Sequence, residues 1–417
     1  MDQAARPDRA FVHIGAPKTG TTFLQRILWD HRNVWPAHGV HYPLAAPDEA
    51  FHATVDVRAM PWGGQLRPEW EGAWERLARR AGGVRGDVVL SHELLCGADA
   101  EAVRRVAGSF PDRELHVVYT LRPLAAMLRS DWQEQVKHRH TQDWADYLVA
   151  VLDRGDDTHL GRWFWTHHDL VDVWGRWSAA VPPARFHVVL ADAAAPRVCL
   201  WEDFAGVVGL PCDVELGDPQ ISPNAGLGLT ATELLAQVNS RLEDKLDDDE
   251  YASVVGGTLV REVLPAAVPS DPVPLPQERR TTIDRRQAEA LACLRDGGLD
   301  VRGSLSTLDG EPGLPAAPGA TSGLGLTADI VAELLGALVA ARGELARVEQ
   351  EAAGLRHEVE QLREAVAGMV TPGPVRRATR RLAARHALVR RLIGVISGGG
   401  ATVTRADPRR AGSRSSD

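Results

Sequence analysis

A glycine-containing loop near the N-terminus carries the residue types that bind a phosphate group. The loop reads GAPKTGTT over residues 15–22, after an apolar run at 11–14 and before an amphipathic stretch at 23–29. This order predicts a strand, a loop and a helix. The amides of such a loop converge, and the helix N-terminus carries partial positive charge. We therefore expect the loop to hold an anion, with Lys18 adding a full positive charge.

The same loop differs from the Walker A loop of kinases and other P-loop phosphotransferases. Gly15 and Gly20 have the Walker A spacing, but Walker A places a lysine directly after the second glycine. Here position 21 is Thr, and Lys18 precedes Gly20 by two residues. A kinase-like nucleotide phosphotransferase, which also needs an acidic Mg²⁺ ligand at a strand end, is the alternative enzyme. A non-catalytic nucleotide-binding scaffold is the alternative from a different class.

The loop resembles the 5′-phosphosulfate loop of sulfotransferases that use PAPS (3′-phosphoadenosine 5′-phosphosulfate), whose pattern is roughly P-K-[ST]-G-T-[ST]. The chain matches that pattern at every position, with Pro17, Lys18, Thr19, Gly20, Thr21 and Thr22. The resemblance, which is closest to bacterial members, implies that these residues bind PAPS. It also implies that Lys18 contacts the 5′-phosphosulfate and stabilises the leaving oxygen, while Thr21, Thr22 and the loop amides hold the 5′-phosphate.

A second element of that family is its 3′-phosphate site, an Arg at a strand end followed by a Ser eight residues later. The run YTLRPLAAMLRS places Arg122 and Ser130 at that spacing, after an apolar run at 115–121. Arginine suits a phosphate because its guanidinium donates a fork of hydrogen bonds. Recognition of a 3′-phosphate would distinguish PAPS from ATP. The family often has Asn or Asp between its Arg and Pro, whereas here Pro123 follows Arg122 directly.

Two adjacent residues are candidates for the catalytic base, because transfer of a sulfuryl group to an alcohol requires removal of the hydroxyl proton. An apolar run at 87–90 is followed by Ser91, His92 and Glu93. Ser91-His92 resembles the Thr-His pair of cytosolic sulfotransferases, whereas branches that act on glycans use Glu. Consecutive side chains on an extended segment point opposite ways, so one of the two is expected to face the sulfate. The Leu-Ser-x-Glu pattern favours Glu93 and leaves His92 as the alternative.

The cytosolic family has a lysine where this chain has Leu90, so a different cation is expected to stabilise the transferred group. Lysine is rare here: the chain has Lys18, Lys137 and Lys245 against 44 Arg. Lys137 lies two helical turns after Ser130, so it either shares that face or is an ordinary surface residue. No metal is expected, because the histidines at 138, 140, 167 and 168 lack a carboxylate or Cys at a recognised ligand spacing.

The apolar runs alternate with helical patterns, which predicts an α/β protein with a parallel sheet covered on both faces. The resemblance implies a three-layer sandwich of the P-loop NTPase-like sulfotransferase fold over residues 1–308. A fourth strand is predicted at 186–191 and a surface helix at 230–246. The segment 265–276 is proline-rich and is predicted to loop over the surface. A tryptophan-bearing insertion at 34–85, with Trp62, Trp70 and Trp74, is a candidate wall for the acceptor site.

The C-terminal part of the chain has a different organisation. Residues 309–326 are rich in Gly, Pro and Ala and are expected to be a linker. Apolar residues then recur at alternating spacings of three and four over 327–370, which predicts a coiled coil and hence a homo-oligomer. The alternative is a lone helix folded back on the body. Residues 371–417, with eleven Arg and two acidic residues, are expected to form a basic amphipathic helix and a disordered tail. This tail is a candidate for contact with an anionic surface or an acidic partner.

The composition excludes several classes of protein. Of the 417 residues, 44% are hydrophobic and 25% are charged, the balance of a soluble globular protein. The N-terminal residues lack the apolar core of a secretory signal, and no apolar run is long enough to span a membrane. The four cysteines form no C-x-x-C pair. These features predict a cytoplasmic protein. The resemblance to PAPS-dependent sulfotransferases implies that it transfers a sulfuryl group from PAPS to a hydroxyl of a carbohydrate or small metabolite.

Overall fold

A parallel sheet of six strands forms the centre of the protein, in the order β2-β3-β1-β4-β5-β6. The computed structural model describes residues 7–61, 65, 67–213, 226–242, 245–268, 270–309 and 324–368. It divides the chain into two units, residues 1–339 and 340–417, and the sheet lies in the first. The strands are β1 (Arg9–Gly15), β2 (Val40–His41), β3 (Asp87–Ser91), β4 (Glu114–Leu121), β5 (Phe186–Leu190) and β6 (Asp300–Arg302). The predicted α/β class is confirmed.

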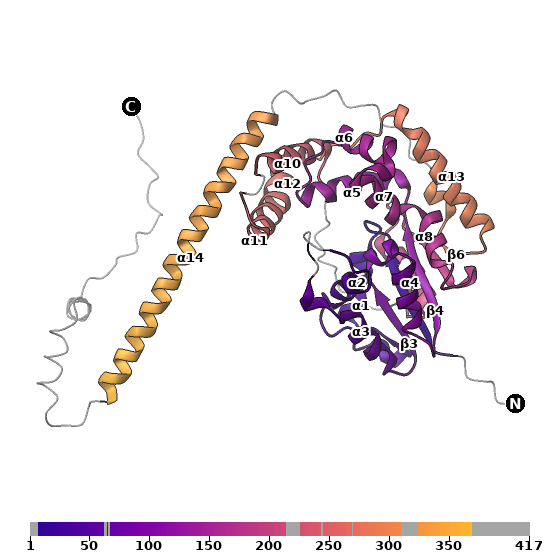
Figure 1. Cartoon of the computed structure of the whole chain (residues 1–417), viewed down its shortest axis with the longest axis horizontal. Coiled ribbons are helices and arrows are strands. Elements are labelled where there is room, and N and C mark those ends of the chain that lie inside the picture. The colour runs from indigo at the N-terminus through magenta and orange to yellow at the C-terminus, as the bar shows by residue number, and fades with distance from the viewer. Residues whose placement is uncertain are drawn as a thin grey trace, which may run out of the picture. The chain divides into compact units, whose positions relative to one another are not determined.

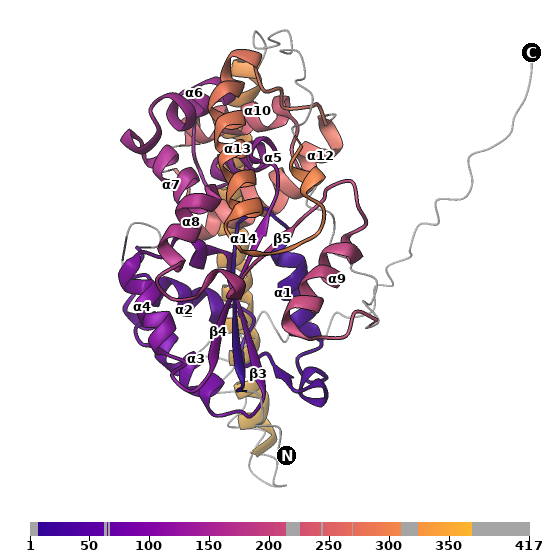
Figure 2. The ribbon, with the colours of Figure 1, turned by 90° about the vertical axis from the view of Figure 1, so that its right-hand side faces the viewer.

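Helices cover both faces of this sheet. Figure 2 shows α1 and α9 on one side of the strands and α2, α3 and α4 on the other. Their bounds are α1 (Thr21–Asp30), α2 (Glu49–Val57), α3 (Ala73–Gly82), α4 (Ala100–Gly108) and α9 (Arg197–Val208). Other α-helices that lie wholly in the described part of the first unit are labelled in Figure 1: α5 (Leu124–Lys137), α6 (Trp144–Leu148), α7 (His159–His168), α8 (Leu170–Trp177), α10 (Leu229–Leu242), α11 (Asp248–Glu250), α12 (Leu264–Ala267) and α13 (Arg280–Asp296).

The strand order brings three functional segments to one edge of the sheet. β1 lies between β3 and β4, and all three run parallel, with Val12 opposite both Leu90 and Val117. Their carboxyl ends therefore meet at the same edge. The segments that follow are the GAPKTGTT loop after β1, His92 and Glu93 after β3, and Arg122 after β4. In open α/β sheets, ligands bind outside the carboxyl ends of the strands where the strand order reverses.

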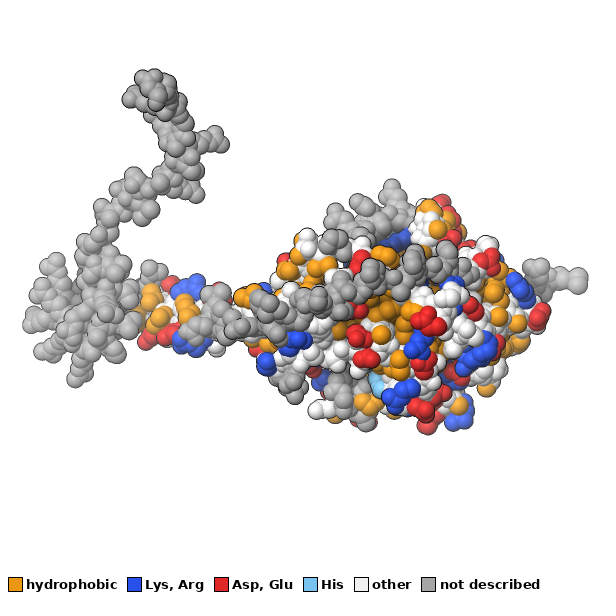
Figure 3. Space-filling model, turned by 90° about the horizontal axis from the view of Figure 1, so that it is seen from above, with side chains coloured by type: hydrophobic (Ala, Val, Ile, Leu, Met, Phe, Trp, Pro, Cys, Tyr) orange, Lys and Arg blue, Asp and Glu red, His pale blue; other side chains and the backbone are white. Residues whose placement is uncertain are grey.

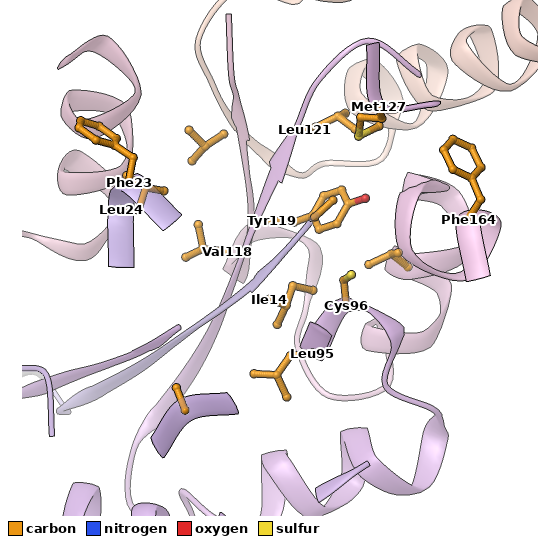
Figure 4. Close-up of a cluster of buried hydrophobic side chains, with 14 of the residues drawn as sticks. Ile14, Phe23, Leu24, Leu95, Cys96, Val118, Tyr119, Leu121, Met127 and Phe164 are labelled. Atoms are coloured by element: carbon orange, nitrogen blue, oxygen red, sulfur yellow. The ribbon is translucent and has the colours of Figure 1, made fainter. Parts of the chain in front are cut away.

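Buried side chains on both faces fix the elements around this edge. Figure 4 shows Ile14 and Tyr119 on the same side of the strands as Leu95 and Cys96, which belong to the short helix η3 (Glu93–Gly97). On the other side, Val118 points toward Phe23 and Leu24 of α1. All seven side chains are buried. The core therefore holds α1, with its preceding loop, and η3, which begins at Glu93, against the ends of β1 and β4.

The structure corrects several predicted elements. The short strands β2 and β6 were not predicted, because two or three residues give no apolar run. The predicted surface helix at 230–246 is α10, and it buries eight of its residues, including Leu235 and Val238. In the segment predicted as a proline-rich surface loop, Pro265 lies in the first turn of α12, and Val273 and Leu275 are buried.

The C-terminal helix α14 runs from Leu324 to Gly368, so it begins inside the predicted linker and covers the predicted heptads to 368. In the first unit, Ala328, Ala332 and Leu335 of this helix are buried. Beyond them, the heptad residues Val348, Leu355 and Leu362 are exposed. Residues 310–323 of the linker and 369–417, including the basic tail, lie outside the described residues.

The surface of the described residues carries both signs of charge. On the face shown in Figure 3, acidic and basic side chains are interspersed. Of the helices that the structure describes, none is both long enough and apolar enough to cross a membrane.

Candidate functional site

The loop between β1 and α1 turns through residues with left-handed backbone angles. Lys18 has a φ of 65° and Gly20, at the N-cap of α1, has a φ of 95°. Glycine adopts this conformation readily, whereas for Lys18 it is a sparsely populated state of the kind found at functional sites. The Phe23 amide donates to the Gly20 carbonyl oxygen at 3.0 Å, whereas no backbone acceptor within the described residues meets the amides of Thr21 and Thr22. This loop therefore offers an anion two amide donors and the lysine.

The threonines and the proline of the loop have different surroundings. The Thr19 hydroxyl is buried, donates to the carbonyl oxygen of Ala16 at 2.6 Å and contacts the Thr120 hydroxyl. Thr19 therefore fastens the loop to β4, and a ligand would meet its backbone rather than its hydroxyl. Thr21 is buried and Thr22 is exposed, while Pro17 is half-buried.

Arg122 joins the end of β4 to the loop. Its Nη1 donates a hydrogen bond of 2.9 Å to the carbonyl oxygen of Lys18. The structure thus brings together two of the predicted donor-binding residues, Lys18 and Arg122. Ser130 lies half-buried on α5, and no hydrogen bond within the described part of the chain joins it to the loop.

Glu134, which sequence reasoning missed, is the partner of the loop lysine. The Lys18 Nζ lies 2.8 Å from the Glu134 Oε2, and the Lys137 Nζ lies 3.8 Å from the same oxygen. The His138 Nε2 lies 3.5 Å from Oε1. Burial disfavours the ionised carboxylate, but His138, Lys18 and Lys137 outweigh burial and hold the pKa of Glu134 well below its usual range. One signal was available: Glu134 lies one helical turn after Ser130.

Lys137 is thus part of this cluster rather than an ordinary surface residue. Its side chain is 21% exposed. Burial and the positive charge of Lys18 lower its pKa, while Glu134 opposes that shift.

At the end of β3, a hydrogen bond from α1 holds Glu93. The Gln25 Nε2 donates to the Glu93 Oε2 at 2.7 Å. Burial favours the protonated carboxyl, but the charge of His92 in its protonated form and the Gln25 hydrogen bond outweigh burial, so the pKa of Glu93 is lowered. Glu93 is therefore a carboxylate at neutral pH. Sequence reasoning had no means to pair Gln25 with Glu93, because they lie 68 residues apart.

His92 is held differently. Its Nδ1 accepts a hydrogen bond of 3.3 Å from the backbone amide of Leu94, so the neutral ring carries its proton on Nε2. Burial lowers the pKa of His92, against the opposing effect of Glu93. His92 is therefore neutral at pH 7, and the nitrogen that would accept a proton is already bonded.

Aromatic side chains of the predicted insertion lie beside His92. The ring centroid of Phe51 lies 5.6 Å from the ring centroid of His92 and 5.3 Å from that of Trp70. All three residues are half-buried. Trp74 is buried in the core, where its Nε1 donates to the Ser109 hydroxyl. Trp62 lies outside the described residues. Of the two predicted wall tryptophans that the structure describes, Trp70 packs against Phe51 beside His92, and Trp74 lies in the core.

Within the residues that the structure describes, no group of three His, Cys, Asp or Glu side chains is arranged to hold a metal ion. The histidine pair at 167 and 168 is buried in the core. The His167 Nδ1 lies 2.7 Å from the carbonyl oxygen of Trp163.

Comparisons with known proteins give one distant likeness. No protein-family model matches the chain, and no curated protein matches it. Among solved structures, the chain is similar to the crystal structure of a sulfotransferase from Alicyclobacillus acidocaldarius, with 19% sequence identity and a TM-score of 0.35. The similarity covers 59% of this chain and 99% of that chain. At this identity and score the likeness carries no conclusion about function, which depends on the residues of the site.

Proposed function

We propose that this protein is a PAPS-dependent sulfotransferase, which transfers a sulfuryl group to a hydroxyl of a carbohydrate or small metabolite. The observation that carries the proposal is the meeting of three segments at the carboxyl ends of β3, β1 and β4. They bring Glu93, Lys18 and Arg122 to one edge of the sheet. Each of these residues has a task in sulfuryl transfer: proton acceptance, stabilisation of the leaving oxygen and recognition of a phosphate.

The loop fits the anionic end of such a donor. Lys18 already binds an anionic group, the Glu134 carboxylate, and the amides of the first turn of α1 are directed at the loop. PAPS supplies a sulfuryl group whose S–O bond to the 5′-phosphate breaks as the acceptor oxygen bonds to sulfur, and the electron pair stays on the phosphate oxygen. Lys18 and the N-terminus of α1 would stabilise that oxygen, as cations and helix ends do in phosphoryl transfer.

Glu93 is the base in this proposal. The lowered pKa keeps its carboxyl group ionised, and Gln25 holds one oxygen, Oε2, so that Oε1 can accept the acceptor's hydroxyl proton. His92 is less suitable, because its Nδ1 already accepts the Leu94 amide hydrogen. In this arrangement His92 can instead donate a hydrogen bond from Nε2 to the acceptor.

Donor selection belongs to Arg122 and Ser130 in this proposal. Both would bind the 3′-phosphate that PAPS has and ATP lacks. A kinase-like reaction is less well supported, because the chain has no lysine directly after Gly20. The half-buried ring of Phe51 beside His92, with the Trp70 ring packed against it, supports an acceptor with an apolar or ring-shaped face.

A transfer assay tests the proposed reaction. Wild-type protein, Lys18→Met and Lys245→Met are each incubated with ³⁵S-labelled PAPS and a panel of glycans and phenolic and aliphatic alcohols. Lys245 is a suitable control because it lies on the surface, where its Nζ donates to the Arg241 carbonyl oxygen. We expect labelled product with the wild type and Lys245→Met, and at least a 100-fold lower rate with Lys18→Met. Transfer that survives Lys18→Met would contradict the proposed role of the loop.

A further inference from the structure

Two of the three lysines in this chain meet at one carboxylate oxygen. The chain uses arginine 44 times and lysine three times. Lys18 reaches the Glu134 Oε2 from the loop after β1, with its Nζ at 2.8 Å, and Lys137 reaches it from the last residue of α5, with its Nζ at 3.8 Å. The two residues are far apart in the sequence, so the fold alone brings their ammonium groups together.

The cluster is partly withdrawn from solvent and has an excess of cations. The side chains of Lys18, Lys137 and Glu134 are 27%, 21% and 36% exposed. One carboxylate therefore faces two ammonium groups, with the His138 imidazole beside its other oxygen. Placing two like charges close together is unfavourable unless an anion lies between them. A group with several negative oxygens would satisfy both lysines better than a single carboxylate.

We propose that Lys137 is the second cation of the transfer site, and that Glu134 is a displaceable counter-ion which holds Lys18 and Lys137 together until the donor binds. The sulfuryl oxygens of the donor then take the place of the Glu134 carboxylate between the two ammonium groups. This inference rests on the proposed function. Lys137 would supply the second positive charge for the transferred group, because this chain has Leu90 at the strand end where cytosolic sulfotransferases have a lysine.

The choice of lysine fits this exchange. An arginine would bind Glu134 through a planar, two-pronged fork, whereas an ammonium group is a compact charge on a flexible stem that can move to another oxygen. During sulfuryl transfer, the electron pair of the breaking S–O bond moves to the leaving oxygen, which gains negative charge. Cations already positioned there stabilise the transition state without reorganisation.

Calorimetric binding of two nucleotides tests the role of Lys137. PAPS carries the sulfuryl group, and adenosine 3′,5′-bisphosphate lacks it. We expect Lys137→Met to weaken PAPS binding at least tenfold and bisphosphate binding less than threefold, Lys137→Arg to restore part of the PAPS affinity, and Lys245→Met to change neither. Equal weakening of both nucleotides, or unchanged PAPS binding, would overturn the inference alone. A wild-type protein that binds neither nucleotide would contradict the proposed function, and the inference with it.

Glu134→Gln gives a second, opposite readout. The substitution removes the negative charge that the donor must displace while keeping the side-chain shape, so PAPS binding is expected to tighten by three- to tenfold. A purely structural role for Glu134 would give unchanged or weaker binding together with a lower melting temperature. Tighter binding in Glu134→Gln and weaker binding in Lys137→Met would together support the exchange, and weaker binding in both would overturn the counter-ion role.

Discussion

Gly15, at the end of β1, lies against the backbone of Glu93, the residue that follows β3 and His92. A Cβ atom at position 15 would be 2.7 Å from the Glu93 carbonyl oxygen and 3.0 Å from its Cβ atom. Gly15 also has a φ of 105°, a conformation that L-residues with side chains rarely adopt. The same contact therefore sets the start of the loop that carries Lys18 and the position of the proposed base.

Replacing Gly15 by alanine should disturb both stability and the site. Overpacking in a close-packed interior costs about 1–3 kcal/mol, and the positive φ adds strain, so Gly15→Ala is expected to lose roughly 2 kcal/mol or more of unfolding free energy. Urea denaturation measures this loss. The control is Gly206→Ala, on an exposed position of α9 where a Cβ meets nothing within 4 Å, and it should stabilise by up to about 1 kcal/mol. Equal changes in unfolding free energy for Gly15→Ala and Gly206→Ala would contradict the close contact of Gly15 with Glu93.

The assignment of the base predicts unequal losses at two adjacent residues. Glu93→Gln removes the carboxylate and should lower the transfer rate by roughly 100-fold or more, because general bases contribute about 10²–10⁴. His92→Asn should lower it less, since the Nδ1 of His92 is already bonded to the Leu94 amide. The two variants are compared by their steady-state transfer rates at saturating PAPS. Their affinity for adenosine 3′,5′-bisphosphate is the folding control. A larger loss in His92→Asn would assign the base to His92.

Burial of His13 predicts an acid-sensitive fold. The side chain is fully buried between the Ser91 and Thr120 hydroxyls, and burial lowers its pKa to about 4. The unfolded chain therefore binds more protons than the native protein between about pH 6.5 and pH 4. The free energy of unfolding is therefore unaffected by the protonation of His13 above this window, and it falls as the pH is lowered through the window.

The measurement is the unfolding free energy of the wild type and His13→Gln from pH 7 to pH 4. One such group adds a slope of up to about 1.4 kcal/mol per pH unit, which should be missing in the variant. The same substitution at the exposed His38 is the control. Identical slopes for the wild type and His13→Gln would contradict this contribution.

The exposed heptad residues predict that α14 mediates self-association. Because Ala328, Ala332 and Leu335 are buried in the first unit, the chain should be shortened only after Val339, where that unit ends. The shortened protein is expected to be monomeric and the full chain oligomeric, with bisphosphate affinity changed less than twofold. Light scattering after size-exclusion chromatography gives both masses. A shortened protein that remains oligomeric would exclude the coiled coil as the cause.

The parts of the fold that could be predicted from sequence are those with local signals. Apolar runs predicted β1, β3, β4 and β5, and the helical spacing expected between Ser130 and Lys137 falls within α5. β2 and β6 have two and three residues, too few for a periodic pattern, and they exist because they pair with neighbouring strands. The helix α10 was predicted to lie at the surface, and its burial depends on packing against α5.

The candidate site also combines residues that have local sequence signals with pairings that have none. The loop and the two strand ends follow from local sequence, so Lys18, Glu93 and Arg122 could be nominated in advance. The pairings Lys18 with Glu134 and Gln25 with Glu93 link residues 116 and 68 positions apart. They depend on where helices dock on the sheet, which no spacing in a single sequence encodes.

The most direct test of the proposed donor site is calorimetric titration with adenosine 3′,5′-bisphosphate, AMP and ATP, using the wild type and Arg122→Ala. We predict that the wild type prefers the bisphosphate to AMP at least tenfold, and that Arg122→Ala abolishes this preference because the guanidinium recognises the 3′-phosphate. The melting temperature of the variant is its folding control, because the Arg122 Nη1 also bonds the Lys18 carbonyl oxygen. A wild type that binds AMP or ATP as tightly as the bisphosphate would contradict the account.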